Sequence, residues 1–319
     1  MSVQPTEFVA RRGSRLADDG FRFLTLFAGL AILAILGLIA LTTLTNAWPA
    51  FRDEGLSFFT STEWVPNEGK FGALAFVYGT AVIGLIAVLL AVPVSVGIAL
   101  FVTEIAPARV RLFTTSVMDL LAGVPSVVFG LWGILVVAPN LQTIYDSFSD
   151  AVDPIPGLSQ LFDGTQTGRS FFTAGLILAL MITPIITSIT REVFTTVPRN
   201  DKDGALALGA TRWEMIRGVV FPHSIGGVVG ATMLGLGRAM GETIAVALVI
   251  GSSPHIVANL FSNGDAMPAV IANQFGEATG THRAALIGLG VVLFLLTIAV
   301  NVSARTVVGR VENRIRGAA

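Results

Sequence analysis

Two charged residues lie four positions apart inside one long apolar stretch of the chain. Arg238 and Glu242 alone interrupt an otherwise uncharged run from 218 to 264. An arginine at the centre of a membrane span costs about 2.5–3.5 kcal/mol on insertion scales, so keeping one there indicates a function. Residues four apart on a helix share a face. The spacing therefore predicts that both side chains lie on one face of a transmembrane helix over 224–250.

The chemistry of this pair favours an oxyanion. A guanidinium group offers a planar fork of N–H donors that fits phosphate oxygens, so we expect Arg238 to attract the anion at the midplane. Phosphate still carries protons near neutral pH, whereas sulfate carries none. We expect Glu242 to accept a hydrogen bond from a phosphate O–H and to repel sulfate. The alternative is an ion pair that only neutralises itself or joins two helices.

Helix-breaking residues mark a second region of interest. Pro125 interrupts an apolar run, and Gly123 precedes it by two residues. A proline frees a backbone carbonyl, which a membrane tolerates where protein or a cavity satisfies it. This pattern fits a broken stretch beside a pathway, with the Ser126 hydroxyl facing it, and equally a simple kink. Elsewhere, small residues predict close helix contacts, at Gly226, Gly230, Gly237 and Gly241.

Composition indicates that lipid surrounds most of the chain. Of the 319 residues, 53% are hydrophobic and only 13% are charged, against about 25% charged in soluble domains. Several uncharged runs reach the roughly 20 residues that cross a bilayer. They predict an all-α membrane protein with six transmembrane helices, near 23–45, 73–101, 114–137, 171–190, 224–250 and 284–304.

The distribution of Lys and Arg predicts the orientation. Fifteen basic residues fall in the N-terminal arm, the second and fourth connections and the C-terminal tail, against four in the other connections. Basic residues gather on the cytoplasmic side, so both termini are expected in the cytoplasm. The predicted parts are an arm over 1–22, a membrane domain over 23–304 with a cytoplasmic loop at 191–222, and a tail over 305–319. A signal peptide is the alternative for the first run, but its apolar core is too long.

The fourth connection has the pattern of two short helices. Apolar residues alternate with polar ones around Ala205, Gly209 permits a turn, and Pro222 stops the second helix. From the pattern alone, an amphipathic helix lying on the membrane surface fits equally well.

Several chemistries are not expected in this chain. It has no cysteine, which excludes disulfides and thiolate metal sites. It lacks a Gly-xxxx-Gly-Lys-Ser/Thr loop, so any nucleotide must bind another chain. His223, His255 and His282 lack metal-ligand spacing. We expect no cofactor, no metal, no nucleic acid and no catalytic chemistry.

The fourth connection resembles the EAA loop of the ABC-importer permeases. Asp203-Gly204-Ala205, then Gly209-Ala210 and finally Pro222 stand at the separations of that motif. Asp203 replaces the usual Glu and keeps its charge, while Gly204 replaces Ala and loosens the helix by roughly 1 kcal/mol. The resemblance implies that Asp203, Ala205, Gly209, Ala210 and Pro222 belong to a coupling segment that docks on an ATPase.

Further segments resemble the phosphate-permease branch of that family, PstC. They cover most of the chain, at 55–64, 71–80, 122–131 and 237–246. The last contains Arg238, Glu242 and Thr243 and distinguishes this branch from the partner permease PstA. The resemblance implies a type I ABC-importer permease fold, a PstA partner, a PstB ATPase dimer and a PstS phosphate-binding protein. Alternatives are a permease for molybdate or sulfate, or an ion-coupled secondary transporter.

Overall fold

The computed structural model describes residues 12–155, 159–163 and 167–316. Six helical stretches in this part are long and apolar enough to cross a membrane, as the sequence predicts. They are Asp18–Glu54, Leu74–Ile105, Ser126–Val152, Phe171–Thr195, Arg212–Met240 and Gly280–Thr306.

The elements of the first half are α1 (Arg12–Glu54), α2 (Ser57–Thr60), β1 (Trp64–Val65), η1 (Pro66–Glu68), β2 (Lys70–Phe71), α3 (Leu74–Leu100), η2 (Phe101–Ile105), α4 (Ala108–Ala122), α5 (Ser126–Trp132), η3 (Gly133–Val137) and α6 (Ala138–Val152). Those of the second half are α7 (Phe171–Thr195), α8 (Arg199–Ala207), α9 (Arg212–Met215), η4 (Ile216–Val220), α10 (Phe221–Met240), α11 (Ile244–Val249), α12 (Met267–Gln274) and α13 (Gly280–Arg316). η1 is a 3-10 turn, and η2, η3 and η4 are π-helical turns.

Two of the predicted spans are divided. The span expected over 114–137 is split between α4 and the continuous helix formed by α5, η3 and α6. The span expected over 224–250 is split between α10 and α11. Helix α1 begins at Arg12 and α13 continues to Arg316, so helix extends into the predicted arm and tail.

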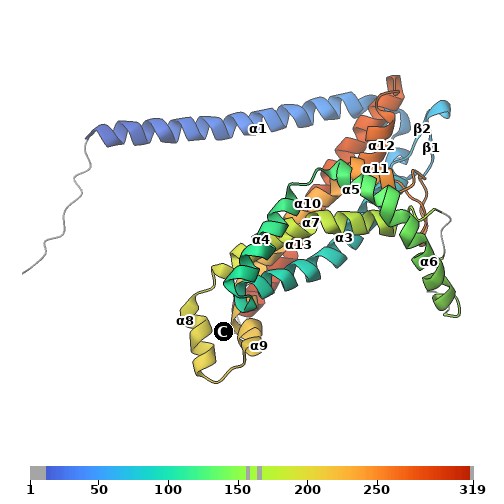
Figure 1. Cartoon of the computed structure of the whole chain (residues 1–319). Helices are drawn as coiled ribbons and strands as arrows, with labels where there is room; N and C mark the ends of the chain where they lie inside the picture. Colours follow the sequence, from blue (N-terminus) through green and yellow to red (C-terminus); the bar gives the residue numbers. More distant parts are fainter. Residues whose placement is uncertain (1–11, 156–158, 164–166, 317–319) are drawn as a thin grey trace, which may run out of the picture.

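The core of the bundle is built on α3, α7 and α10. Side chains of α3 and α7 such as Ile83, Ile177 and Ile182 are buried together with Ala231 and Ala239 of α10. By contrast, α1 extends away from the other helices (Figure 1), and nearly all its apolar side chains are exposed. The end of α1 packs beside α13, where Ala50 is buried.

One end of the molecule, which we call the hairpin end, carries the β1–β2 hairpin, α12 and the loop 251–266 (Figure 1). Tyr78 donates a hydrogen bond to the Val257 carbonyl at 2.6 Å, and Thr80 accepts one at 3.0 Å from the N–H that opens α12. Between them, Gly79 leaves room for the Asp265 carbonyl, which would lie 1.9 Å from an added Cβ. The segment Tyr78-Gly79-Thr80 therefore fastens this loop to α3.

Aromatic contacts hold the hairpin to the neighbouring helices. Trp64 Nε1 and His282 Nε2 both donate to Oε1 of Gln274, at 2.9 and 3.1 Å. The His282 ring stacks on Phe71 with centroids 5.6 Å apart. These contacts join the hairpin to α12 and α13.

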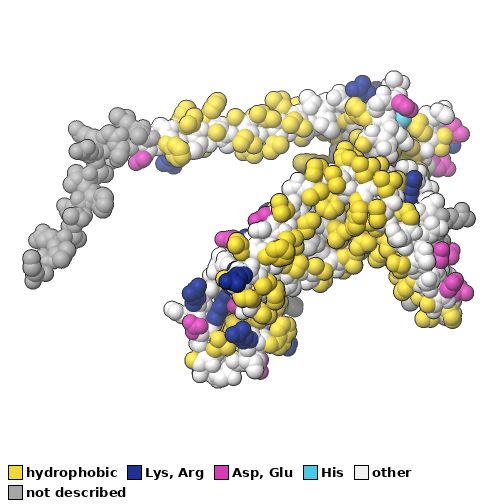
Figure 2. All heavy atoms as spheres, in the orientation of Figure 1, with side chains coloured by type: hydrophobic (Ala, Val, Ile, Leu, Met, Phe, Trp, Pro, Cys, Tyr) yellow, Lys and Arg dark blue, Asp and Glu magenta, His cyan; other side chains and the backbone are white. Residues whose placement is uncertain are grey.

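The opposite end, which we call the coupling end, carries α8 and α9. Most dark-blue Lys and Arg side chains visible in Figure 2 gather there, together with some acidic side chains, and further acidic side chains appear on α6 and the hairpin. Hydrophobic side chains cover the surface between the two ends.

Candidate functional site

Residues Gly241 to Thr243 break the helix that was expected to carry both members of the charged pair. Helix α10 ends at Met240, and Gly241 caps it. Glu242 lies beyond that end, where its carboxylate accepts a hydrogen bond from the Ala245 N–H at 3.4 Å, at the start of α11. The prediction that the two side chains share one helical face was therefore wrong, because the four-residue rule holds only within an unbroken helix.

The second break, predicted at Gly123 to Gly130, is present between α4 and α5. Helix α4 ends at Ala122, and α5 begins at Ser126 directly after Pro125. Proline has no N–H and disfavours helical geometry in the residue before it, which explains the interruption.

The two breaks lie side by side because α5 packs parallel to α11. A Cβ added to Gly130 would lie 2.8 Å from Cα of Ala245, and one added to Gly133 would lie 2.7 Å from Val249. Ser126 is one turn before Gly130, so it stands near the level of residues 241–244. The fold thus brings Ser126 close to the segment that carries Glu242 and Thr243, both of them half-buried.

Arg238 is exposed and forms no ion pair or hydrogen bond with any of the described residues. A self-neutralising pair with Glu242 is therefore not present in this structure. A guanidinium left without a partner inside a membrane span retains all its donors for a ligand or a neighbouring chain.

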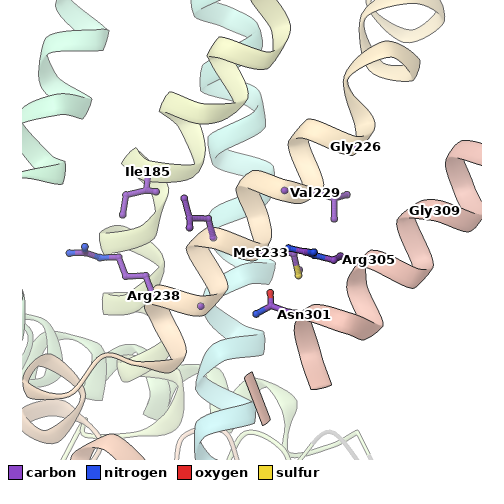
Figure 3. Close-up of a pocket in the computed structure, with 11 residues that line it drawn as sticks. Ile185, Gly226, Val229, Met233, Arg238, Asn301, Arg305 and Gly309 are labelled. Atoms are coloured by element: carbon purple, nitrogen blue, oxygen red, sulfur yellow. The ribbon is translucent and has the colours of Figure 1, made fainter. Parts of the chain in front are cut away.

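A groove of about 910 Å³ runs along α10 from Arg238 toward the coupling end. In Figure 3, Arg305 of α13 points toward Met233. The Arg238 side chain extends in the other direction, away from Met233. Gly230 and Gly237 border this groove, and a Cβ added to either would meet nothing within 4 Å. The close helix contacts expected at these two glycines are therefore absent among the residues that the structure describes.

Other glycines make the close contacts instead. A Cβ added to Gly227 would lie 2.5 Å from Val193, and one added to Gly235 would lie 2.7 Å from Ile186. Both partners belong to α7, so α10 presents one small-residue face to the bundle and leaves another open.

The segment between α7 and α10 forms the helix–turn–helix that its glycine predicts. Gly209 has a φ of +89°, and the Ala210 N–H donates to the Ala205 carbonyl at 3.2 Å, which closes α8 in a Schellman turn. Thr211 and Glu214 then cap α9 with a capping box. The prediction that Pro222 stops the second helix was wrong: α9, η4 and α10 continue as one helix from Arg212 to Met240, and Pro222 lies just after the π-helical turn Ile216–Val220.

This segment presents apolar side chains to solvent. Leu208 is 91% exposed and Trp213 is 62% exposed. Asp203 is also exposed, whereas Ala205 is half-buried and packs on an inner cluster that includes Phe194 and Met215. Sequence reasoning did not select Leu208 or Trp213, although two large apolar residues flanking a glycine turn are a signal for a docking surface.

Comparisons with known proteins give a consistent result. A model of the family "Binding-protein-dependent transport system inner membrane component" matches residues 95–317. The chain is 45% identical to "Phosphate transport system permease protein PstC" of Xylella fastidiosa (strain Temecula1 / ATCC 700964), over 93% of this chain and 92% of the relative. It is 42% identical to the protein of the same name from Mesorhizobium japonicum, over 98% and 96%.

Among solved structures, a bacterial alginate ABC transporter in complex with an alginate pentasaccharide-bound periplasmic protein has a chain of similar fold. The TM-score is 0.61, with 15% sequence identity, over 93% of this chain and 98% of that one. At this identity the likeness supports the fold alone, and it agrees with the predicted permease architecture.

Proposed function

The chain belongs to the family of binding-protein-dependent transport system inner membrane components, among the PstC permeases, and from this premise we propose that it conducts inorganic phosphate as one subunit of an ATP-driven importer. The observation that carries the proposal is the match to relatives named as phosphate permeases over 93% of the chain. The unpaired Arg238 beside two helix breaks supplies a chemical reason.

In this proposal the chain forms half of the pathway and a second permease, PstA, forms the rest. Arg238 is exposed in the single chain, and the partner covers it so that phosphate meets the guanidinium without lipid. Ser126, Glu242 and Thr243 supply hydrogen-bonding groups at the neighbouring breaks. A broken span can expose such groups because backbone inside a membrane may lack helical bonds where it lines a cavity.

ATP hydrolysis belongs to a PstB dimer that binds the coupling end. Leu208 and Trp213 provide the apolar contact, and Asp203 provides the charge. A PstS protein delivers phosphate at the hairpin end. In this arrangement the coupling end, where Lys and Arg gather in Figure 2, lies in the cytoplasm. Both termini lie there too, as the distribution of Lys and Arg along the sequence predicts.

ATP-dependent phosphate uptake tests the proposal, in cells that lack their own importer and receive all four subunits. We expect Arg238→Gln to lower uptake by about tenfold or more, the value of one charge-assisted hydrogen bond. Arg52→Gln is the matched control, because Arg52 is exposed on α1 away from the breaks. Normal uptake by an assembled Arg238→Gln complex would mean that Arg238 has a structural role and does not take part in transport.

Substrate competition separates phosphate from other oxyanions. We expect Glu242→Gln to weaken the preference for phosphate over sulfate, because Gln no longer repels the fully charged anion. Glu277→Gln, at an exposed position of the hairpin end, should leave the preference unchanged. Uptake of molybdate or sulfate but not phosphate by the wild type would identify another oxyanion permease, and uptake without ATP would identify an ion-coupled transporter.

A further inference from the structure

One ion pair at the coupling end differs from the others in the described part of the chain. Lys202 Nζ of α8 lies 2.6 Å from Oε1 of Glu104 in η2, and the two side chains are only 16% and 11% exposed. Lys70, at the hairpin end, pairs with Glu63 and Glu68, but all three side chains are more than half exposed. A shielded pair holds its geometry more firmly than an exposed one, because water competes less for either charge.

The pair joins elements that the chain itself does not connect. Short connections join α8 to α7 before it and to α9 after it, whereas more than 90 residues separate Lys202 from Glu104. Lys202 also donates to the Phe194 carbonyl near the end of α7, at 3.5 Å. The Lys202 ammonium group thus links α8 to the C-terminal ends of both α3 and α7.

Helix α3 leads from this pair to the break beside Arg238. η2 continues α3 without interruption, and a Cβ added to Gly84 of α3 would lie 3.4 Å from Met240, the last residue of α10. Glu104 lies in this π-helical turn, and π turns are frequent at functional sites. A displacement of α8 is therefore connected to residues 241–243 through the packed side chains of α3 and α10.

We propose that the Lys202–Glu104 pair transmits movement of the coupling segment to α3 and through it to the break at Gly241–Thr243. The inference rests on the proposed function, in which the ATPase displaces α8. Both residues act as positioning residues, because neither lies at the breaks where the anion is expected. Without the pair, α8 still docks on the ATPase through Leu208 and Trp213, but its movement no longer reaches the pathway through α3.

The test measures phosphate uptake and ATP hydrolysis together in vesicles containing the four-subunit complex. We expect Lys202→Gln and Glu104→Gln to raise the ATP consumed per phosphate several-fold while hydrolysis persists. The charge-swapped double variant Lys202→Glu/Glu104→Lys should return the ratio toward that of the wild type. Lys70→Gln, which removes the exposed pairs, should leave the ratio unchanged.

A cross-linking experiment keeps the inference falsifiable where a single variant assembles poorly. The chain has no native cysteine, so Lys202→Cys/Glu104→Cys can be joined by a short reducible bis-methanethiosulfonate in a complex whose other subunits lack cysteine. We expect the cross-link to lower the ATP-to-phosphate ratio and its reduction to raise the ratio again in the same polypeptide.

The outcomes separate the two proposals. Absence of phosphate uptake by the wild-type complex would overturn the proposed function. A wild type that transports phosphate, with variants whose ATP-to-phosphate ratio stays unchanged, would overturn only the role of the pair. A cross-link that forms and leaves the ratio unchanged would do the same.

Discussion

The two ends of the molecule are built on different principles. At the hairpin end, hydrogen bonds and a close glycine contact join the loop 251–266 to α3, and stacked aromatic rings join the β1–β2 hairpin to α13. At the coupling end, α8 and α9 expose large apolar side chains and are anchored by a small cluster and one shielded ion pair. The comparison indicates that the first end is a fixed frame, while the second is a surface completed by another protein.

We expect a substitution of Gly79 to destabilise the hairpin end most. In Gly79→Ala the new Cβ would lie 1.9 Å from the Asp265 carbonyl, and backbone on both sides limits relaxation. We expect a loss of about 3 kcal/mol of stability, the upper part of the range for overpacking. Thermal unfolding of the purified complex measures it. Gly97→Ala on the same helix meets nothing within 4 Å and is the control. Equal stability of the two variants would contradict a rigid frame.

Asp265 refines the comparison of the two ends, because its buried carboxylate lowers the stability of the hairpin end. Burial raises the pKa of its carboxyl from 3.8 to about 6, against the lowering effect of the hydrogen bond from the Ala266 N–H. The folded protein therefore binds this proton more tightly than the unfolded chain does. Its stability should rise as the pH falls from about 6 toward 4, and the charged carboxylate costs stability above pH 6.

Removing the charge tests this dependence. We expect Asp265→Asn to stabilise the complex by about 3 kcal/mol at pH 7.5, since the pKa is raised from 3.8 to about 6 and each pKa unit corresponds to about 1.4 kcal/mol, and to have little effect at pH 4. Thermal unfolding at both pH values gives the difference. A stabilisation that is equal at both pH values would mean that it does not come from removing the charge of Asp265.

The coupling end should respond through partner binding and not through stability. Leu208→Ser removes an apolar side chain that is 91% exposed in this chain. We expect about tenfold weaker ATPase association with little change in unfolding temperature, because burying a leucine is worth about 1.5–3 kcal/mol. Co-purification of the ATPase subunit with the permease measures the association.

The control for this variant stands at the opposite end. Leu56 is 83% exposed near the hairpin, and Leu56→Ser should leave ATPase association intact. Equal losses in the two variants would mean that exposure, and not position, determines the effect.

Local sequence rules predicted the elements better than their interruptions. The six spans follow from uncharged runs, and the turn at Gly209 follows from a glycine between two amphipathic patterns. The break after Met240 does not follow from the sequence around it, because the residues through Ile250 are apolar or small apart from Glu242, and a single Gly241 is compatible with helix. After the break α11 packs on α5 through Gly130, a tertiary contact that the local sequence does not indicate.

The candidate site residues show the same difference between what local sequence predicts and what only the fold shows. Their types were sufficient to select Arg238, Glu242 and Ser126, but their relative placement required the fold. The Lys202–Glu104 pair joins positions far apart in the chain, and no pattern in one sequence indicates such a contact. The open glycines on α10 were equally unpredictable, because spacing alone does not say which face meets a neighbour.

The exposed Arg238 has a consequence for biogenesis. A newly inserted chain without its partner holds a guanidinium against lipid, at a cost of about 2.5–3.5 kcal/mol. In the proposed complex the partner permease covers Arg238 and removes that cost, so the charge would distinguish an orphan subunit from a finished complex. We expect permease made in excess of its partner to be recognised by membrane proteases and cleared, which would keep the two permeases in equal number.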